Sequence, residues 1–238
     1  LILAQFCPPA PKRFFKPGYT YSSVGKKKTL DETQKDERIL YCKDMLKRKA
    51  KPLEEIFFAD ETGISLSEAF KSKAWTGPRK KVKVEEPVRN VKLNCWGAIS
   101  ARGATSLHIY KENLKADKYT KIVEEHIEEM EELYPDGFTY THDNLPVHIA
   151  AESDLEEDGL DMVLFPSYSP DLSPIENLWR SLKYRVAGDN PRTELQLRKS
   201  LEKHWEIITR PENLSPYFGN LADRYRECIQ ESGERLPY

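Results

Sequence analysis

The sequence predicts an α/β protein in which a mixed sheet is flanked by helices on both faces. Short continuous apolar runs, such as residues 56–59, are typical of strands that are covered on both sides. These runs alternate with segments of helical period, such as residues 117–134 and 175–186. Acidic residues follow several of the runs. We therefore expect carboxylates to gather where neighbouring strands of the sheet end.

Length and composition predict one globular domain with an extension. The chain has 238 residues, of which 39% are hydrophobic and 32% are charged, and this length is enough to bury one sizeable core. No stretch approaches the roughly eighteen apolar residues of a membrane span, and no signal-peptide pattern is present. We therefore expect an intracellular protein without a membrane partner. Its four scattered cysteines are expected to be reduced structural thiols.

Charge is distributed unevenly along the chain. The net charge is only −2, but residues 1–51 hold 13 Lys/Arg against 5 Asp/Glu, and residues 71–92 hold 8 against 2. Residues 112–161 instead carry 3 Lys/Arg against 16 Asp/Glu. Basic segments could contact the phosphates of a polyanion, while the acidic part faces solvent or concentrates metal ions. The small net charge therefore does not argue against a nucleic-acid partner.

The chain is expected to begin with an arm and a helix. Residues 1–28 are rich in Pro, Lys and aromatic residues without a sustained period, which indicates an extended basic linker or arm. Residues 29–32 fit a capping box that opens a helix running to about Lys49, and this helix is expected to pack on the domain that follows. The expected division is residues 1–51 for the arm and lead-in helix and 52–238 for the α/β domain.

The first expected strand, Ile56 to Ala59, leads to a candidate metal ligand. Because side chains alternate along a strand, Asp60 shares a face with Phe58, whereas Glu61 points the other way. Asp60 is therefore the better candidate ligand of the two. A return strand is expected from about Ile64.

A basic loop and a hairpin are expected next. Residues 74–83 form a basic loop that either is solvated or contacts DNA. The candidate phosphate contacts are Arg79, Lys80, Lys81 and Lys83. Residues 92–100 and 103–110 have the pattern of two strands joined by a Gly-containing turn, which predicts a hairpin.

A long helix and a second acidic position follow. Residues 117–134 predict one amphipathic helix with an acidic solvated face, and His126 lies on its apolar side as an expected core residue. The next expected strand, residues 138–142, leads to Asp143. Asp143 or Asn144 could instead cap the helix that opens near Pro146. In the first turn of that helix, His148 could be a surface residue or reach the site.

The third acidic position, Glu176, lies at the start of an amphipathic helix. A strand at residues 162–165 and a proline-rich turn precede it, and Ser173 can cap the helix while Pro174 suits its first position. Residues 173–176 also fit S-x-x-E, a capping box in which Glu176 would bond back to the cap amide. Alternatively, Asp60, Asp143 and Glu176 could form a hard-oxygen site for a divalent cation. Thr193 is expected to cap another helix, and a last helix is expected over residues 215–231.

Four ordered motifs resemble those of DDE transposases of the mariner superfamily, in the branch with Glu at the third acidic position. They are FFADE at 57–61, WGAIS at 96–100, HDNLPVHIA at 142–150 and SPDLSPIENLW at 169–179. The resemblance implies a ribonuclease-H-like catalytic domain that extends from about residue 57 through nearly the whole chain. It also implies that Asp60, Asp143 and Glu176 are metal-binding catalytic carboxylates, supported by Asn144 and His148.

Other residues of these motifs match the family less closely. Asp171 matches no ligand, and a turn or capping role suits it. His142 stands where Gln is common, and Ser173 replaces a common Asn. The 32 residues between Asp143 and Glu176 are slightly fewer than is usual in this branch, which leaves the subfamily open.

The resemblance implies cut-and-paste DNA transposition, in which hydrolysis at the transposon ends precedes attack of the freed 3′-hydroxyl on target DNA. Mg²⁺ is the expected cofactor, with Mn²⁺ as a substitute, and Asp60 is the expected bridging ligand of two ions. The expected partners are terminal inverted repeats, a TA-containing target and a second copy of the chain. A eukaryotic host would imply the nucleus. The family's upstream helix-turn-helix region is expected to be missing here.

Two other functions remain open on the sequence. A ribonuclease-H-like nuclease would share the metal chemistry but lack strand transfer. A domesticated, non-catalytic DNA-binding protein derived from a transposase is an alternative of a different class. The presence of all three acidic residues favours catalysis.

Overall fold

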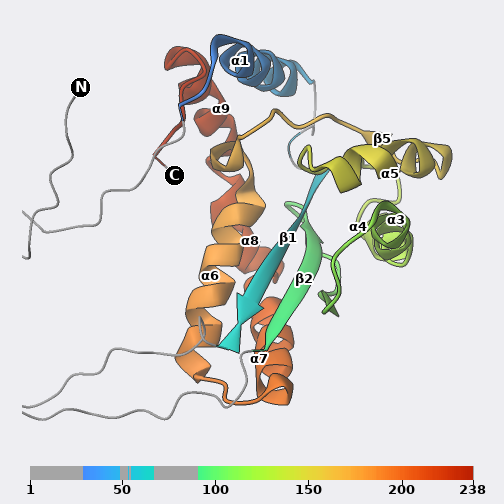
Figure 1. Ribbon diagram of the computed structural model, residues 1–238. Helices are drawn as coiled ribbons and strands as arrows, with labels where there is room; N and C mark the ends of the chain where they lie inside the picture. Colours follow the sequence, from blue (N-terminus) through green and yellow to red (C-terminus); the bar gives the residue numbers. More distant parts are fainter. Residues whose placement is uncertain (1–28, 49–52, 54, 67–90, 238) are drawn as a thin grey trace, which may run out of the picture.

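The structure is a computed structural model that describes residues 29–48, 53, 55–66 and 91–237 (Figure 1). The expected arm at residues 1–28 and the candidate DNA contacts Arg79, Lys80, Lys81 and Lys83 lie outside the described residues. No helix among the described residues is both long and apolar enough to cross a membrane.

A mixed five-stranded sheet forms the centre of the fold, in the order β3-β2-β1-β4-β5. β1 pairs antiparallel with β2 and parallel with β4, while β3 and β5 form the edges. The strands are β1 (Ile56–Ser65), β2 (Lys92–Ile99), β3 (His108–Tyr110), β4 (Thr139–Thr141) and β5 (Asp161–Met162). The predicted mixed sheet and the predicted hairpin of β2 and β3 are confirmed.

Helices cover both faces of this sheet, as predicted. In Figure 1, α6 runs along β1 on one side, and α3, α4 and α5 lie on the other. The helices are α1 (Glu32–Lys47), α3 (Ala116–Glu124), α4 (Ile127–Leu133), α5 (Pro146–Glu157), α6 (Pro174–Asp189), α7 (Glu194–Ile208), α8 (Pro211–Phe218) and α9 (Leu221–Gln230), with the short 3₁₀ helix η1 (Pro170–Leu172) before α6. α1 packs on α9, so the lead-in helix contacts the α/β domain as expected.

Alternation along β1 divides the hydrophobic core into two layers. Phe58 joins the layer beneath α6 and α7, and Phe57 joins the layer beneath α3 and α5. Asp60 continues the alternation of Phe58, and its Oδ2 accepts a hydrogen bond of 3.0 Å from the Trp179 indole of α6. The predicted facing of Asp60 is confirmed.

β1 is longer than the sequence pattern predicts. The expected return strand from Ile64 is wrong, because β1 continues without a turn and Ile64 pairs with Leu93 of β2. Ile64 and Leu93 are both buried, so pairing with β2 covers the second half of the strand. Asp60 therefore lies in the middle of a strand, where its backbone pairs with Gly97 of β2.

Three predicted helix boundaries are also wrong. The predicted helix at 117–134 breaks into α3 and α4 at His126, whose Nδ1 lies 2.7 Å from the Ile122 carbonyl and whose ring packs on Trp96. His126 is buried, as predicted. The predicted last helix is two helices, α8 and α9, separated at Gly219 and Asn220. Asp31 rather than Thr29 caps α1.

Two smaller predictions hold. Thr193 caps α7 by accepting a hydrogen bond from the Gln196 amide at 3.2 Å. Among the described residues, Cys42, Cys95 and Cys228 are buried free thiols.

Candidate metal centre

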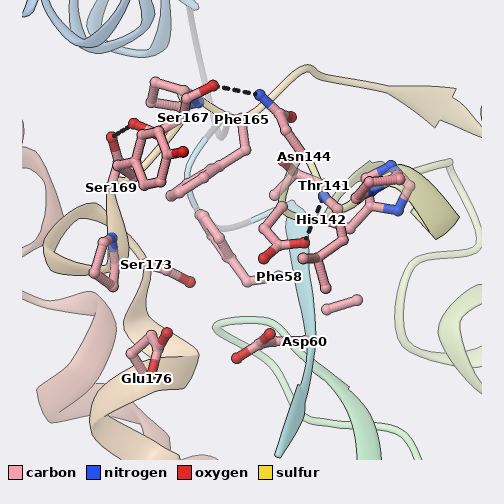
Figure 2. A pocket seen from close by; sticks show the side chains of 17 residues that line it. Phe58, Asp60, Thr141, His142, Asn144, Phe165, Ser167, Ser169, Ser173 and Glu176 are labelled. Atoms are coloured by element: carbon pink, nitrogen blue, oxygen red, sulfur yellow. Dashed lines mark hydrogen bonds between the residues drawn. The ribbon is translucent and has the colours of Figure 1, made fainter. Parts of the chain in front are cut away.

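An open cavity of about 540 Å³ lies where β1 and the end of β4 face α6. Asp60 of β1, Asp143 after β4 and Glu176 of α6 all line this cavity. Figure 2 shows Asp60 and Glu176 on facing elements, with Ser169 and Ser173 on the turn that leads into α6. The fold therefore brings the three predicted acidic side chains, which are distant in sequence, to one place.

Asp60 owes its position to a glycine on the neighbouring strand. Gly97 of β2 is its pairing partner, and a Cβ on Gly97 would lie 2.7 Å from the Trp205 ring. The missing side chain lets the Trp205 ring stack on Trp179, with ring centroids 5.0 Å apart. That stacking fixes the indole whose N–H donates to Asp60. The glycine of the WGAIS motif thus helps to hold the first carboxylate.

Glu176 lies in the first turn of α6, and its carboxylate is not used to cap that helix. Ser173 is the N-cap residue and Pro174 follows it, as predicted, but the Ser173 side chain makes no capping bond. The Ser173 amide already donates to the Pro170 carbonyl at 3.2 Å, within the preceding 3₁₀ turn. The capping-box interpretation is therefore wrong. Glu176 is exposed and lines the cavity.

Asp143 is held by a buried histidine. His148 is 0% exposed, and its Nδ1 lies 2.7 Å from Asp143 Oδ1 while its Nε2 lies 3.1 Å from Glu61 Oε2. Burial opposes the charge of His148, but hydrogen bonds to Asp143 and Glu61 outweigh it and raise the pKa to about 10. His148 therefore reaches the site as a buried cation. Leu145, not Asp143 or Asn144, is the N-cap residue of α5, so the predicted cap is wrong.

The pKa of Asp143 is lowered, whereas that of His148 is raised. Burial favours its neutral form, but the hydrogen bond and charge of His148 lower the pKa below its usual range. Asp143 is therefore ionised at neutral pH. Asn144, the other predicted supporting residue, is exposed at the cavity and donates to Ser167 Oγ at 3.2 Å (Figure 2).

A neutral histidine lies against the charged one. The rings of His142 and His148 stack with centroids 4.9 Å apart and planes 11° apart. Burial and the charge of His148 lower the pKa of His142 to about 3, so His142 is neutral at pH 7. The Tyr119 hydroxyl lies 2.7 Å from its Nδ1. Tyr119 and Glu61 were not predicted as partners of His142 and His148, because these contacts join elements that are distant in the sequence.

Asp60 and Glu176 lie in surroundings that disfavour their charged forms. Burial raises the pKa of Asp60 well above its usual range, and the charges of Glu176 and Glu61 raise it further. Partial enclosure of its carboxyl group at the cavity raises the pKa of Glu176, and the charge of Asp143 adds to this effect, while Lys183 and Arg180 act against it. A bound divalent cation would relieve the repulsion among these carboxylates.

The donor chemistry fits a hard divalent cation, because the three carboxylates supply only oxygen ligands. Their present arrangement is less complete. Among the described residues, no three His, Cys, Asp or Glu side chains are already gathered around one ion position. Asp60 is engaged by Trp179, and Asp143 is engaged by His148. Ion binding therefore requires these side chains to turn further into the cavity.

Asp171 occupies a separate, fully paired environment. Its two carboxylate oxygens accept hydrogen bonds of 2.9 Å and 2.6 Å from Arg38 of α1, which is 0% exposed. The Leu236 amide donates to the same carboxylate at 2.9 Å. Asp171 thus anchors α1 and the C-terminal segment to the turn before α6. The predicted turn role is too narrow, because no local pattern indicates the contact with Arg38, which lies 133 positions away.

Known proteins resemble this chain over the region that contains the three cavity carboxylates. A family model described as DDE superfamily endonuclease matches residues 55–198. The Tc3 transposase of Caenorhabditis elegans is 25% identical over 149 residues, which cover 60% of this chain and 45% of that protein. The Tc1 transposase of the same organism is 34% identical over 74 residues, covering 30% of this chain and 27% of that protein. The match spans less than half of either curated relative.

Solved structures support the fold. A Mos1 mariner paired-end complex with Mn has a TM-score of 0.76 at 20% identity, covering 90% of this chain and 68% of that one. The isolated catalytic domain of Mos1 mariner transposase has a TM-score of 0.70 at 20% identity, covering 89% of this chain and 100% of that one. The predicted ribonuclease-H-like fold is therefore confirmed. Since the family model covers more than half of the chain and includes all three cavity carboxylates, this protein belongs to the DDE superfamily endonuclease family.

Proposed function

We propose that this chain is the catalytic part of a cut-and-paste DNA transposase of the mariner type. The observation that carries the proposal is the gathering of Asp60, Asp143 and Glu176 at one cavity of a ribonuclease-H-like fold. Membership of the DDE endonuclease family and the similarity to the Tc3 and Tc1 transposases support it. The reaction would be hydrolysis at the transposon ends, followed by strand transfer of the 3′-hydroxyl into target DNA.

The proposed cofactor is Mg²⁺, with Mn²⁺ as a substitute, and Asp60, Asp143 and Glu176 would hold it. Two divalent cations, when bound, would activate the attacking water or 3′-hydroxyl and stabilise the leaving oxygen. Asp60 lines the cavity together with both other carboxylates and is the proposed bridging ligand. Solved complexes of Mos1 with Mg and with Mn support this choice of ions.

The chain's own residues would prepare the site for this chemistry. Trp179 keeps the Asp60 carboxylate on the α6 side of the sheet. His148 keeps Asp143 ionised and oriented, and Glu61 holds the second nitrogen of that histidine. No Ser or Cys nucleophile is required, because the attacking group is water or a DNA hydroxyl.

The proposed partners are transposon terminal inverted repeats, a TA-containing target and a second copy of the chain. The similar Mos1 structures include paired-end complexes, one of them with the left transposon end, and a pre-cleavage transpososome, which supports DNA ends as substrates. The nucleus is the proposed location if the host is eukaryotic. A helix-turn-helix region upstream of this domain would supply recognition of the repeats.

The test is cleavage and joining of labelled DNA that carries the element's own end. We expect Mg²⁺-dependent cutting and joining by the wild type, and loss of both by Glu176→Gln. Arg185→Gln, an exposed change on the same helix, is the matched control and should remain active. Cutting without joining would favour a nuclease. DNA binding without cutting would favour a domesticated DNA-binding protein.

A further inference from the structure

The helix that carries Glu176 has a basic exposed face beyond the cavity. Arg180 and Lys183 follow Glu176 at the fourth and seventh positions along α6, and both are exposed. Rotation of about 100° per residue puts the three side chains within roughly 60° of one another around the helix axis. With a rise of about 1.5 Å per residue, Lys183 lies roughly 10 Å beyond Glu176. The face therefore begins at the cavity and leads away from it.

Neither basic side chain is used within the fold. In the described part of the chain, Arg180 and Lys183 form no ion pair with a carboxylate. Both nevertheless lie close enough to Glu176 for their charges to act against the rise in its pKa. Their positive charges are thus available to a polyanion that also reaches Glu176.

A hollow connects this face with the candidate metal centre. A second cavity, of about 570 Å³, is lined by Glu176, Asn177, Arg180 and Arg235 together with the segment around Asp171. Glu176 borders both cavities, so they meet at its side chain. An extended chain of phosphates could occupy this second hollow while one phosphate lies at the carboxylates.

An exposed aromatic side chain borders the same face. Tyr184 is 81% exposed, the highest value among the exposed large hydrophobic residues of the described chain. It lies one residue beyond Lys183 and about 80° around the helix from Glu176. An aromatic ring beside two cations suits a nucleic acid strand, because phosphates pair with the cations and a base can stack on the ring.

We propose that the exposed face of α6 formed by Arg180, Lys183 and Tyr184 binds the DNA strand whose phosphate reacts at the carboxylates. Arg180 and Lys183 contact successive phosphates of the strand that leaves the cavity, and Tyr184 stacks on an unpaired base. Arg180 and Lys183 are about 4.5 Å apart along the helix axis. This separation is similar to the advance of about 3.4 Å per nucleotide of the phosphates of one strand along a duplex. This surface deepens the proposed transposase function and rests on it, and it does not include the basic residues at 79–83, which lie outside the described chain.

The test measures binding of the 238-residue chain to DNA without metal, so that no cutting occurs. The probe is a fluorescein-labelled duplex of arbitrary sequence with a single-stranded overhang, and anisotropy gives the Kd over a range of salt concentrations. Arg180→Gln combined with Lys183→Gln should weaken binding and lower the slope of log K against log salt by about 2, as expected for two lost phosphate contacts.

Arg185→Gln is the matched control for charge. Arg185 is equally exposed on α6 but lies about 180° around the axis from Glu176, so its removal should leave the salt slope unchanged. Tyr184→Ala should weaken binding to the overhang probe about fivefold, and Tyr184→Phe should restore it. Thermal unfolding checks that every variant is folded. We expect each of them to fold, because the substituted side chains are exposed.

The outcomes separate this proposal from the proposed function. An unchanged salt slope in the double variant, an effect of equal size in Arg185→Gln, or a wild-type chain that does not bind the probe would each overturn the DNA-binding face. Cleavage of transposon ends would still support the transposase in those cases. Conversely, the predicted slope changes without any metal-dependent cleavage would support the face and remove the catalytic function.

Discussion

Asp171 and Glu176 lie five residues apart in one motif, and the fold treats them in opposite ways. Asp171 is buried and fully paired, with Arg38 and the Leu236 amide on its carboxylate. Glu176 is exposed at a cavity that it shares with Asp60 and Asp143. The first carboxylate is satisfied by the protein itself, whereas the second adds to a local excess of negative charge.

This difference separates an acidic residue that stabilises the fold from one that serves a site. A buried carboxylate whose two oxygens both accept hydrogen bonds from an arginine is not available to bind a metal ion. Carboxylates that raise one another's pKa store repulsion, which an added cation can relieve. The contrast predicts that the same chemical change has opposite consequences at the two places.

The largest expected effect is on stability at Arg38. Arg38→Met should lower the free energy of unfolding by about 3–5 kcal/mol, because it leaves the Asp171 carboxylate buried without its cation. Urea denaturation measures the change. Lys43→Met, an exposed change on the same helix, is the control and should shift stability by less than about 0.5 kcal/mol. Similar losses in both variants would mean that Asp171 is not anchored by Arg38.

The next effect concerns the histidine that holds Asp143. His148→Gln should weaken Mn²⁺ binding about tenfold, since residues that orient a metal ligand typically contribute that much. Isothermal titration calorimetry gives the affinity. His204→Gln removes a histidine that is bonded to Asp189 and does not line the cavity, so it should leave the affinity unchanged. Equal affinities in the wild type and His148→Gln would count against the orienting role.

The smallest expected effect is a gain in stability at Asp60, where the same substitution at Asp171 should cause a loss. Asp60→Asn should raise metal-free stability at pH 7 by on the order of 1 kcal/mol, because it removes a buried charge that Glu176 and Glu61 repel. Asp171→Asn, the same chemical change, should lower stability. Since the folded pKa of Asp60 is raised, its destabilisation develops as pH rises above about 4, so the gain of Asp60→Asn should vanish at pH 3. Urea denaturation at both pH values would show a loss in both variants if the contrast is wrong.

Local patterns made the three cavity carboxylates candidates, and the resemblance to the transposase family selected them over the capping roles that Asp143 and Glu176 could also have had. Alternation along β1 was enough to turn Asp60 toward α6. The expected gathering at strand ends does not describe Asp60, which lies in the middle of β1. The S-x-x-E pattern at 173–176 was misleading for a physical reason. A sequence match cannot reveal that the Ser173 amide is already bonded to Pro170.

The supporting interactions could not be predicted, because they join distant segments. Glu61 and His148 are 87 positions apart, and Arg38 and Asp171 are 133 apart. The break at His126 has the same origin, since its ring packs against Trp96 of the sheet. Contacts of this kind are set by the tertiary fold rather than by periodicity.

The proposed metal centre requires Asp60, Asp143 and Glu176 to bind a divalent cation together, and Mn²⁺ titration followed by electron paramagnetic resonance measures that binding. The wild type should bind Mn²⁺, and Glu176→Gln should weaken binding at least tenfold without lowering the unfolding temperature of the metal-free protein. Asp154→Asn, an exposed acidic residue of α5 outside the cavity, should bind as the wild type does. Equal Mn²⁺ binding by the wild type and Glu176→Gln would contradict the account.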